Sequence, residues 1–71
     1  MQYDEEIKKF GCRVKAMREK RNLTMSFANY KDGLNPSTIS RIEKGEVEPK
    51  LGTLIKLAEA FDVKLKDLVD F

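Results

Sequence analysis

Apolar residues recur along the first third of the chain with spacings that alternate between four and three. They are Tyr3, Ile7, Phe10, Val14 and Met17. Because residues three and four apart share one face of an α-helix, this stripe predicts one amphipathic helix from about Asp4 to Arg21. Acids in its first turn and basic residues in its last turn suit the helix macrodipole. Gly11 interrupts the stripe, and we expect it to allow close packing against another element.

A shorter pattern follows and ends in a glycine turn. Leu23 and Phe27 are an i, i+4 apolar pair, and Thr24 between them is a suitable helix N-cap. A second helix is therefore expected over residues 25–31. The Asp-Gly pair that follows it predicts a tight turn, because glycine adopts positive φ freely.

The segment NPSTISRIEKG, residues 35–45, carries the clearest helix signals in the chain. Asn35 can accept a backbone N–H of the first turn, and Pro36 suits the first helical position. Gly45 is the type of residue that ends a helix in the left-handed conformation. Two isoleucines three positions apart share the inner face of the predicted helix 36–44. Its outer face offers hydroxyls, one guanidinium and one ammonium.

The last third predicts two further helices. Leu51, Leu54, Ile55, Ala58 and Phe61 form a strong amphipathic pattern that Asp62 closes. A short final helix follows and ends in an apolar tail. That tail either seals a small core or forms a dimer seam through Leu65, Leu68, Val69 and Phe71.

A helix, a short glycine turn and a second helix are the layout of the helix-turn-helix motif, whose second helix enters the DNA major groove. A helix of about nine residues is roughly 13 Å long, comparable to the ~12 Å width of that groove. We therefore interpret residues 36–44 as a recognition helix.

The distribution of charge agrees with this interpretation. The net charge of the chain is only +2, but residues 7–45 carry ten Lys and Arg against three acids, which gives +7. The opening acids, Asp4 to Glu6, contribute −3, and residues 46–71 carry four Lys against six acids, or −2. The basic half contains the proposed recognition helix, as a phosphate-binding surface requires.

Composition excludes several other classes. With 71 residues the chain is one domain, residues 1–71, near the lower limit for folding alone. No apolar run approaches the ~20 residues of a membrane span, and the start lacks the apolar centre of a signal peptide. With one cysteine and no histidine, we expect no internal disulfide, zinc site or common nucleophile–base pair. We expect Cys12 to pack on the first helix. A cytoplasmic, non-enzymatic protein without cofactors is expected.

From Phe10 to Phe71 the chain resembles the Cro/C1-type (XRE family) helix-turn-helix transcriptional regulators. The resemblance is carried by Arg18, by STISRIE followed by Gly45, by Pro49 and by LIKLAEAFDVKLKDLV. It implies an all-α, compact, five-helix lambda-repressor-like DNA-binding domain over residues 10–71. Residues 1–9 would then be an N-terminal extension of the first helix.

The resemblance also implies roles for individual residues. Those that would approach base edges are Asn35, Pro36, Ser37 and Arg41, and those that would approach phosphates are Thr24, Met25, Lys44 and Lys50. Ser40 shares the exposed face, and Thr38 divides between packing and phosphate. We expect Arg41 to read guanine, because its fork can pair with O6 and N7. An ion pair between Arg18 and Glu43 would link two helices.

The chain departs from the family pattern around its second helix. Met25 stands where the family usually has a glutamine that donates to a phosphate, and methionine cannot donate. An ungapped match would bury Asn29 and Asp32, at a cost on the order of a few kcal/mol each if unpartnered. We therefore prefer a one-residue shift that buries Phe27 and Ala28 instead.

These expectations describe a homodimeric repressor that binds a double-stranded operator through two half-sites about 34 Å apart. The alternative is a protein-partner module, such as an antitoxin or another component of a toxin–antitoxin or restriction–modification system. A phage-type repressor and a restriction–modification controller remain open within the DNA-binding class.

Overall fold

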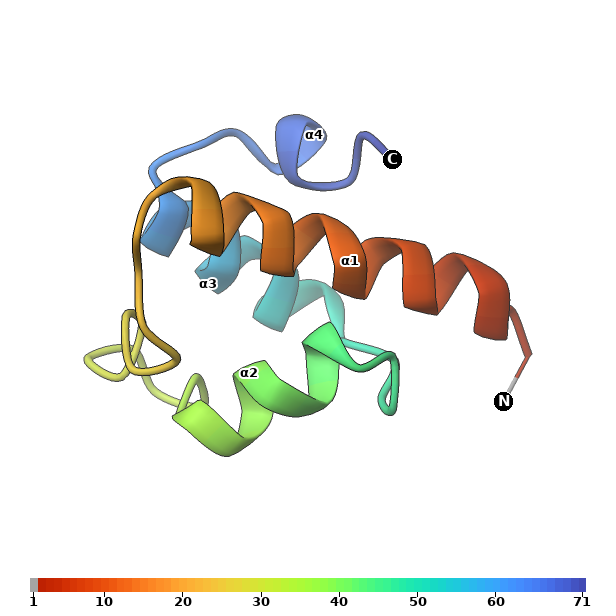
Figure 1. Cartoon of the computed structure of the whole chain (residues 1–71), viewed down its shortest axis with the longest axis horizontal. Helices are drawn as coiled ribbons and strands as arrows, with labels where there is room; N and C mark the ends of the chain where they lie inside the picture. The colour runs from red at the N-terminus through yellow and green to blue at the C-terminus, as the bar shows by residue number, and fades with distance from the viewer. Residues whose placement is uncertain (1) are drawn as a thin grey trace.

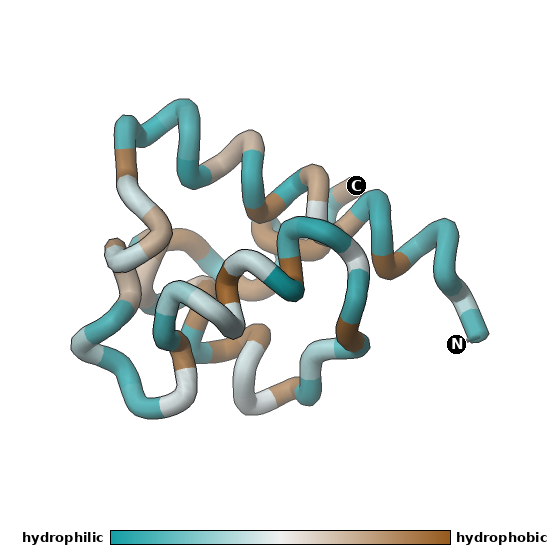
Figure 2. Tube along the Cα trace, turned by 60° about the horizontal axis from the view of Figure 1, so that its bottom comes forward, coloured by the Kyte–Doolittle hydropathy of each residue, from teal (hydrophilic) through white to brown (hydrophobic). Residues whose placement is uncertain are grey.

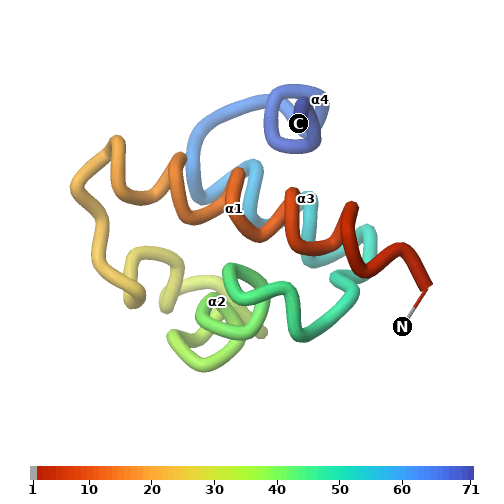
Figure 3. Tube along the Cα trace, turned by 45° about the vertical axis from the view of Figure 1, so that its right-hand side comes forward, coloured from red at the N-terminus to blue at the C-terminus, as the bar shows by residue number. Residues whose placement is uncertain are grey.

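The computed structural model describes residues 2–71 and folds them into four α-helices. These are α1 (Asp4–Lys20), α2 (Pro36–Glu43), α3 (Leu51–Phe61) and α4 (Leu65–Leu68). In two views α2 and α4 lie on opposite sides of α1 and α3 (Figures 1 and 3). The proposed recognition helix is therefore separated from the C-terminal turn by the thickness of the domain.

The helix boundaries follow local signals that the sequence contains. Asn22, just beyond α1, and Asp62, just beyond α3, adopt φ of 55° and 59° in the left-handed region. Gly45 ends α2 in the same region, at φ 71°. Asparagine, aspartate and glycine tolerate this conformation best, so α1, α2 and α3 each stop where such a residue follows.

The expected count of five helices is wrong for the described residues 2–71, because residues 25–31 form consecutive turns instead of an α-helix. Their backbone hydrogen bonds join residues three apart, such as Phe27 N–H to Thr24 C=O and Asn29 N–H to Ser26 C=O. Serine and asparagine compete with helical bonding, and the Thr24 hydroxyl accepts the Ser26 N–H at 3.3 Å. The segment still packs as the preferred register expects.

That packing is visible in the burial of four residues. Ala28 is fully buried, and the Phe27 ring is half-buried and stacks on the Phe61 ring with centroids 4.6 Å apart. Asn29 and Asp32 are exposed, so no polar side chain of this segment is forced into the core. The shifted register is therefore confirmed for burial, although the helix itself is absent.

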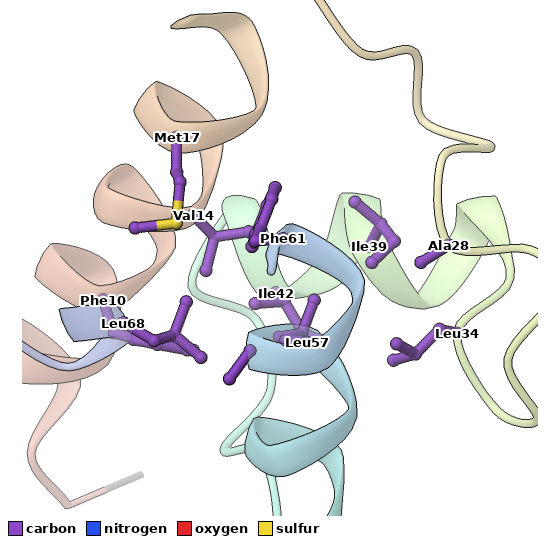
Figure 4. Close-up of a cluster of buried hydrophobic side chains, with 11 residues drawn as sticks. Phe10, Val14, Met17, Ala28, Leu34, Ile39, Ile42, Leu57, Phe61 and Leu68 are labelled. Carbon is purple, nitrogen blue, oxygen red and sulfur yellow. The ribbon is translucent and has the colours of Figure 1, made fainter. Parts of the chain in front are cut away.

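One cluster of apolar side chains holds the described part of the chain together. Figure 4 shows side chains from all four helices and from the turn segment pointing into it. The most completely buried large members are Val14, Leu34, Ile39, Ile42, Leu57 and Leu68. Along the chain trace, the hydrophobic residues lie mainly toward the interior and the hydrophilic ones run along the outside (Figure 2).

Two expectations about single residues are wrong. Cys12 is exposed and does not pack into the core, because its position on α1 faces away from the apolar stripe. Leu68 is fully buried, so it seals the core from α4 and is not available for a dimer seam. Within residues 2–71 no helix has both the length and the apolar character needed to cross a membrane.

Candidate nucleic-acid interface

The N-terminus of α2 is built by a local cap. The Asn35 side-chain oxygen accepts the Thr38 backbone N–H at 2.9 Å and the Thr38 hydroxyl at 3.1 Å. Pro36 occupies the first turn, where its missing N–H is not needed. This cap occupies the oxygen of Asn35 and leaves its amide N–H₂ as the group that can still donate outward. Thr38 is half-buried and committed to the cap.

The outward face of α2 presents most of the predicted base-contacting residues together. A shallow hollow on this face is lined by Pro36, Ser37, Ser40, Arg41, Lys44 and Glu46. Ser37, Arg41 and Lys44 are exposed, and the side chain of Arg41 makes no hydrogen bond or ion pair to other described residues. Its guanidinium is therefore free to meet an external acceptor.

The inward face fixes the orientation of α2. Ile39 and Ile42 are 0% and 1% exposed, so the helix cannot rotate without bringing apolar surface into water. The buried side also approaches α1 very closely at Gly11. A Cβ added to Gly11 would lie 2.4 Å from the Ile42 carbonyl oxygen and 2.7 Å from that of Glu43. Only glycine allows this separation of the two helices.

A bidentate ion pair connects α2 to α1. Arg18 Nε donates to Glu43 Oε2 at 2.7 Å, and Arg18 Nη2 donates to Glu43 Oε1 at 3.1 Å. Arg18 Nη1 also donates to the Leu23 carbonyl oxygen at 2.8 Å, which links the chain leaving α1 to the same cluster. The side chains are only 11% and 3% exposed. The pair expected from the family resemblance is thus present in the structure.

This pairing also affects proton binding. The hydrogen bond to Glu43 is the main reason that the pKa of Arg18 is raised above its ordinary value, with a smaller opposing effect from burial. An arginine guanidinium is always charged in proteins, and the pairing with Glu43 reinforces this. The carboxylate of Glu43 points into the protein, and it is consequently not offered to DNA.

The predicted phosphate contacts at the edges of α2 are less uniform. Thr24 and Lys50 are exposed, and Lys50 precedes the first residue of α3. Met25 is half-buried and packs against the core, so its side chain serves the fold. The phosphate contact expected for Met25 is therefore not supported, because its side chain has no hydrogen-bond donor and packs against the core.

Two residues near the C-terminal end of α2 were missed by the sequence analysis. Glu46 brings a carboxylate to the same hollow as Arg41 and Lys44. Lys8 of α1 packs directly on Gly45, so that a Cβ added to Gly45 would lie 2.7 Å from the Lys8 Cγ. Lys8 thereby adds a basic residue beside the end of α2. The one sequence signal for this position is that Lys8 directly follows Ile7, a residue of the apolar stripe of α1.

The described part of the chain offers no cluster of metal-binding side chains. Among residues 2–71 no group of three or more His, Cys, Asp or Glu side chains is arranged to hold a metal ion. The arrangement of α2 is that of an exposed donor surface on a rigid support, which can form hydrogen bonds and ion pairs with an anionic polymer.

Comparison with known proteins points in the same direction. A family model described as "Helix-turn-helix" matches residues 14–68. The HTH-type transcriptional repressor RghR of Bacillus subtilis is 38% identical over 64 residues, which cover 89% of this chain and 47% of that protein. An uncharacterized HTH-type transcriptional regulator, MJ0272 of Methanocaldococcus jannaschii, is 38% identical over 79% of this chain and 85% of its own length.

The fold also has a solved counterpart. The restriction-modification controller protein C.AhdI from Aeromonas hydrophila superposes with a TM-score of 0.85 and is 26% identical. The match covers 96% of this chain and 99% of that one. RghR is longer than this chain, which spans only about half of its length.

Proposed function

The chain belongs to the helix-turn-helix family of transcriptional regulators, in its XRE type, and from this membership we propose that it is a sequence-specific repressor that reads the major groove with α2. Asn35, Pro36, Ser37, Ser40 and Arg41 would face base edges. Thr24, Lys44 and Lys50 would contact phosphates, and Thr38 would support the first turn. We do not retain Met25 in this set, since its side chain packs inward.

The observation that carries this proposal is the two-sided character of α2. On its apolar side, Ile39 and Ile42 are no more than 1% exposed, and its acidic residue, Glu43, is paired with Arg18. The Thr38 hydroxyl is held by the cap, whereas the exposed side chains of Ser37 and Arg41 have no hydrogen-bond or ion-pair partner within residues 2–71. A buried ion pair on one side and an unpaired guanidinium on the other suit a helix inserted into a groove.

Arg41 supplies the direct test. Operator sequences would be selected from randomised double-stranded DNA, and the affinities of wild-type, Arg41→Ala and Arg41→Lys proteins would be compared. Loss of bidentate pairing should weaken the selected site by about 1–3 kcal/mol for each half-site. Arg41→Lys should keep non-specific binding but lose sequence preference, because an ammonium is not a fork. Unchanged preference in both variants would contradict the proposed readout.

We also propose that the protein acts as a homodimer. One short helix offers few base contacts, and two-fold pairing on two half-sites is the usual route to affinity and specificity. With Leu68 buried, the large exposed apolar side chains other than Tyr3 and Tyr30 are on α3 and the tail. Leu51 is 61% exposed, Ile55 44%, Val69 39% and Phe71 55%, while Leu65 is half-buried. Such a surface suits an isologous interface.

Ile55→Glu tests this surface. A charge placed in an apolar interface should shift the dimer dissociation constant upward by at least about tenfold, while an exposed position leaves the monomer folded. Sedimentation velocity over a range of concentrations measures the shift. The matched control is Tyr30→Glu, which places the same charge at a position 73% exposed on the turn segment. Equal dimerisation of wild type and Ile55→Glu would exclude this face.

A second candidate, favoured by the similarity to C.AhdI, is control of a restriction–modification system. A controller would bind an operator that also lies before the gene of a nuclease, whereas an antitoxin would form a complex with a toxin. Sequencing of the reading frames beside the gene, followed by co-purification from the source cell, distinguishes these. Capture of a toxin partner with no operator binding would overturn the repressor proposal.

A further inference from the structure

Three segments that are far apart in the sequence border an open, mainly apolar hollow that is lined by no residue of α2. The start of α1, the stretch leading into α3 and the C-terminal residues line a volume of about 390 Å³. The C-terminal segment runs alongside α1 (Figure 1), and the Phe10 and Phe71 rings lie 6.1 Å apart at an interplanar angle of 53°. Small-molecule sites in proteins typically occupy about 300–1,000 Å³ and are mainly apolar.

The charged groups that line this hollow are of one sign. In the part of the chain that the structure describes, they are the carboxylates of Glu6 and Glu48, and no Lys or Arg lines it. This is notable because the chain has 14 Lys and Arg against 12 acids. Neither carboxylate forms a hydrogen bond or ion pair within residues 2–71. The hollow is thus electrostatically suited to a cation and unsuited to an anion.

Aromatic rings provide a second attraction for the same kind of ligand. Tyr3 and Phe71 stand at the hollow with 66% and 55% of their surfaces exposed, and Phe10 lies deeper. The face of an aromatic ring attracts a cation that lies within about 6 Å of its centroid. Apolar walls, ring faces and unpaired carboxylates therefore favour one chemical class.

We propose that this hollow binds a lipophilic organic cation, a molecule with an apolar body and a permanent positive charge. A second copy of the chain is the less suitable occupant, because a two-fold axis through the hollow would bring four carboxylates together. Of the residues proposed above for dimerisation, Leu51 and Ile55 lie outside the hollow, whereas Val69 and Phe71 also line it, so the hollow borders the proposed dimer surface. The cation site is separate from the DNA-binding face and does not rest on it.

Two probes of the same shape and opposite charge test the proposal. Tetraphenylphosphonium and tetraphenylborate would each be titrated into the full chain by calorimetry, with methyl NMR signals of Ile7, Leu54 and Val69 locating the site. The phosphonium should bind at least about tenfold more tightly and shift those methyl signals. Because the net charge of the chain is +2, non-specific attraction would favour the borate instead.

Paired substitutions separate this site from general charge effects. Glu6→Gln/Glu48→Gln should weaken phosphonium binding at least about tenfold, since two opposite charges are removed. Glu5→Gln/Glu19→Gln changes net charge equally at exposed positions that do not line the hollow, and it should leave the affinity unchanged. Tyr3→Asn should also weaken binding without unfolding, because Asn tolerates the φ of 62° at this exposed position.

Three results would overturn the proposal. Equal binding of both probes would make the hollow merely apolar, and retained affinity in Glu6→Gln/Glu48→Gln would remove the role of the carboxylates. A phosphonium affinity that falls as the protein dimerises would show a second copy seated in the hollow. Failure of operator binding in the Arg41 test leaves each of these measurements unaffected.

Discussion

At the scale of single residues, the distance between α1 and α2 depends on one absent side chain. Gly11 is buried against the backbone carbonyls of Ile42 and Glu43. Glycine normally weakens a helix interior by about 1 kcal/mol relative to alanine. Here the glycine lets α1 and α2 pack closely, which compensates for that loss. A larger residue would clash with backbone atoms of α2, which cannot move aside as a flexible side chain can.

Gly11→Ala should therefore destabilise the domain by about 2 kcal/mol, the range typical of overpacking, despite the higher helix propensity of alanine. Gly52→Ala is the matched control, because a Cβ at Gly52 would meet nothing within 4 Å. That variant should gain up to about 1 kcal/mol. Urea unfolding followed by far-UV circular dichroism measures both, and a Gly11→Ala protein as stable as wild type would contradict the proposed contact.

The Arg18–Glu43 pair is the second residue-scale determinant. Removing one partner leaves the other nearly buried and unpaired, so Glu43→Met should lower the free energy of unfolding by about 3 kcal/mol. Arg18→Met/Glu43→Met should lose less than the sum of the two single variants, because no uncompensated charge remains. A double-mutant cycle by urea unfolding measures this coupling, and strictly additive losses would indicate that the pair does not act as a unit.

At the scale of elements, α2 is only eight residues long and depends on its cap and its packing. The Asn35 oxygen serves two donors of Thr38, so the same residue both begins the helix and faces the proposed DNA surface. The adjoining turn segment is held from the other side, where Phe61 contacts both Phe27 and the Arg21 guanidinium, which lies 5.6 Å from the ring centroid. Rigid support on both sides keeps α2 oriented for binding.

Substitution of Asn35 can separate folding from binding. Asn35→Ala removes the cap and should cost about 1 kcal/mol of stability. Asn35→Asp keeps an acceptor at the helix N-terminus, so its stability should stay within about 0.5 kcal/mol of wild type or rise. Its operator affinity should nevertheless fall, because a carboxylate would face phosphates. Thermal unfolding and fluorescence anisotropy measure the two properties, and an Asn35→Asp protein with full affinity would place Asn35 outside the interface.

At the scale of the whole molecule, α2 and α4 lie on opposite sides of the domain (Figure 3). The exposed basic residues Arg41 and Lys44 lie at α2, on the side away from α4. This arrangement would direct the proposed DNA-binding face toward phosphate during encounter.

The salt dependence of operator binding should reflect this arrangement. The logarithm of affinity should fall linearly with the logarithm of salt concentration, and Lys50→Gln in both protomers should reduce the slope by about 2. Lys66→Gln, an equal change of charge on α4, should leave the slope unchanged. Anisotropy titrations between 50 and 300 mM salt measure the slope. Over this range the Debye length falls roughly to half or less. A flat plot for wild type would instead indicate a protein partner.

Local chemistry explains why much of the fold was predictable. The apolar stripes of α1 and α3, the cap of α2 and the left-handed residue after each of these three helices act within a few positions of the chain. The turn segment was harder, since residues 25–31 combine a weak apolar pair with serine and asparagine, and their choice between helix and turns depends on how Phe27 meets Phe61.

The sequence alone determined that the described chain is helical, where α1, α2 and α3 end, and which face of α2 is apolar, because periodicity and caps are short-range properties. Only the tertiary structure decided that Met25 and Leu68 face inward, that Lys8 crosses Gly45, and that Glu6 and Glu48 share a hollow with Phe71. These relations join segments far apart in the chain, and they follow from how the helices pack together rather than from any local preference.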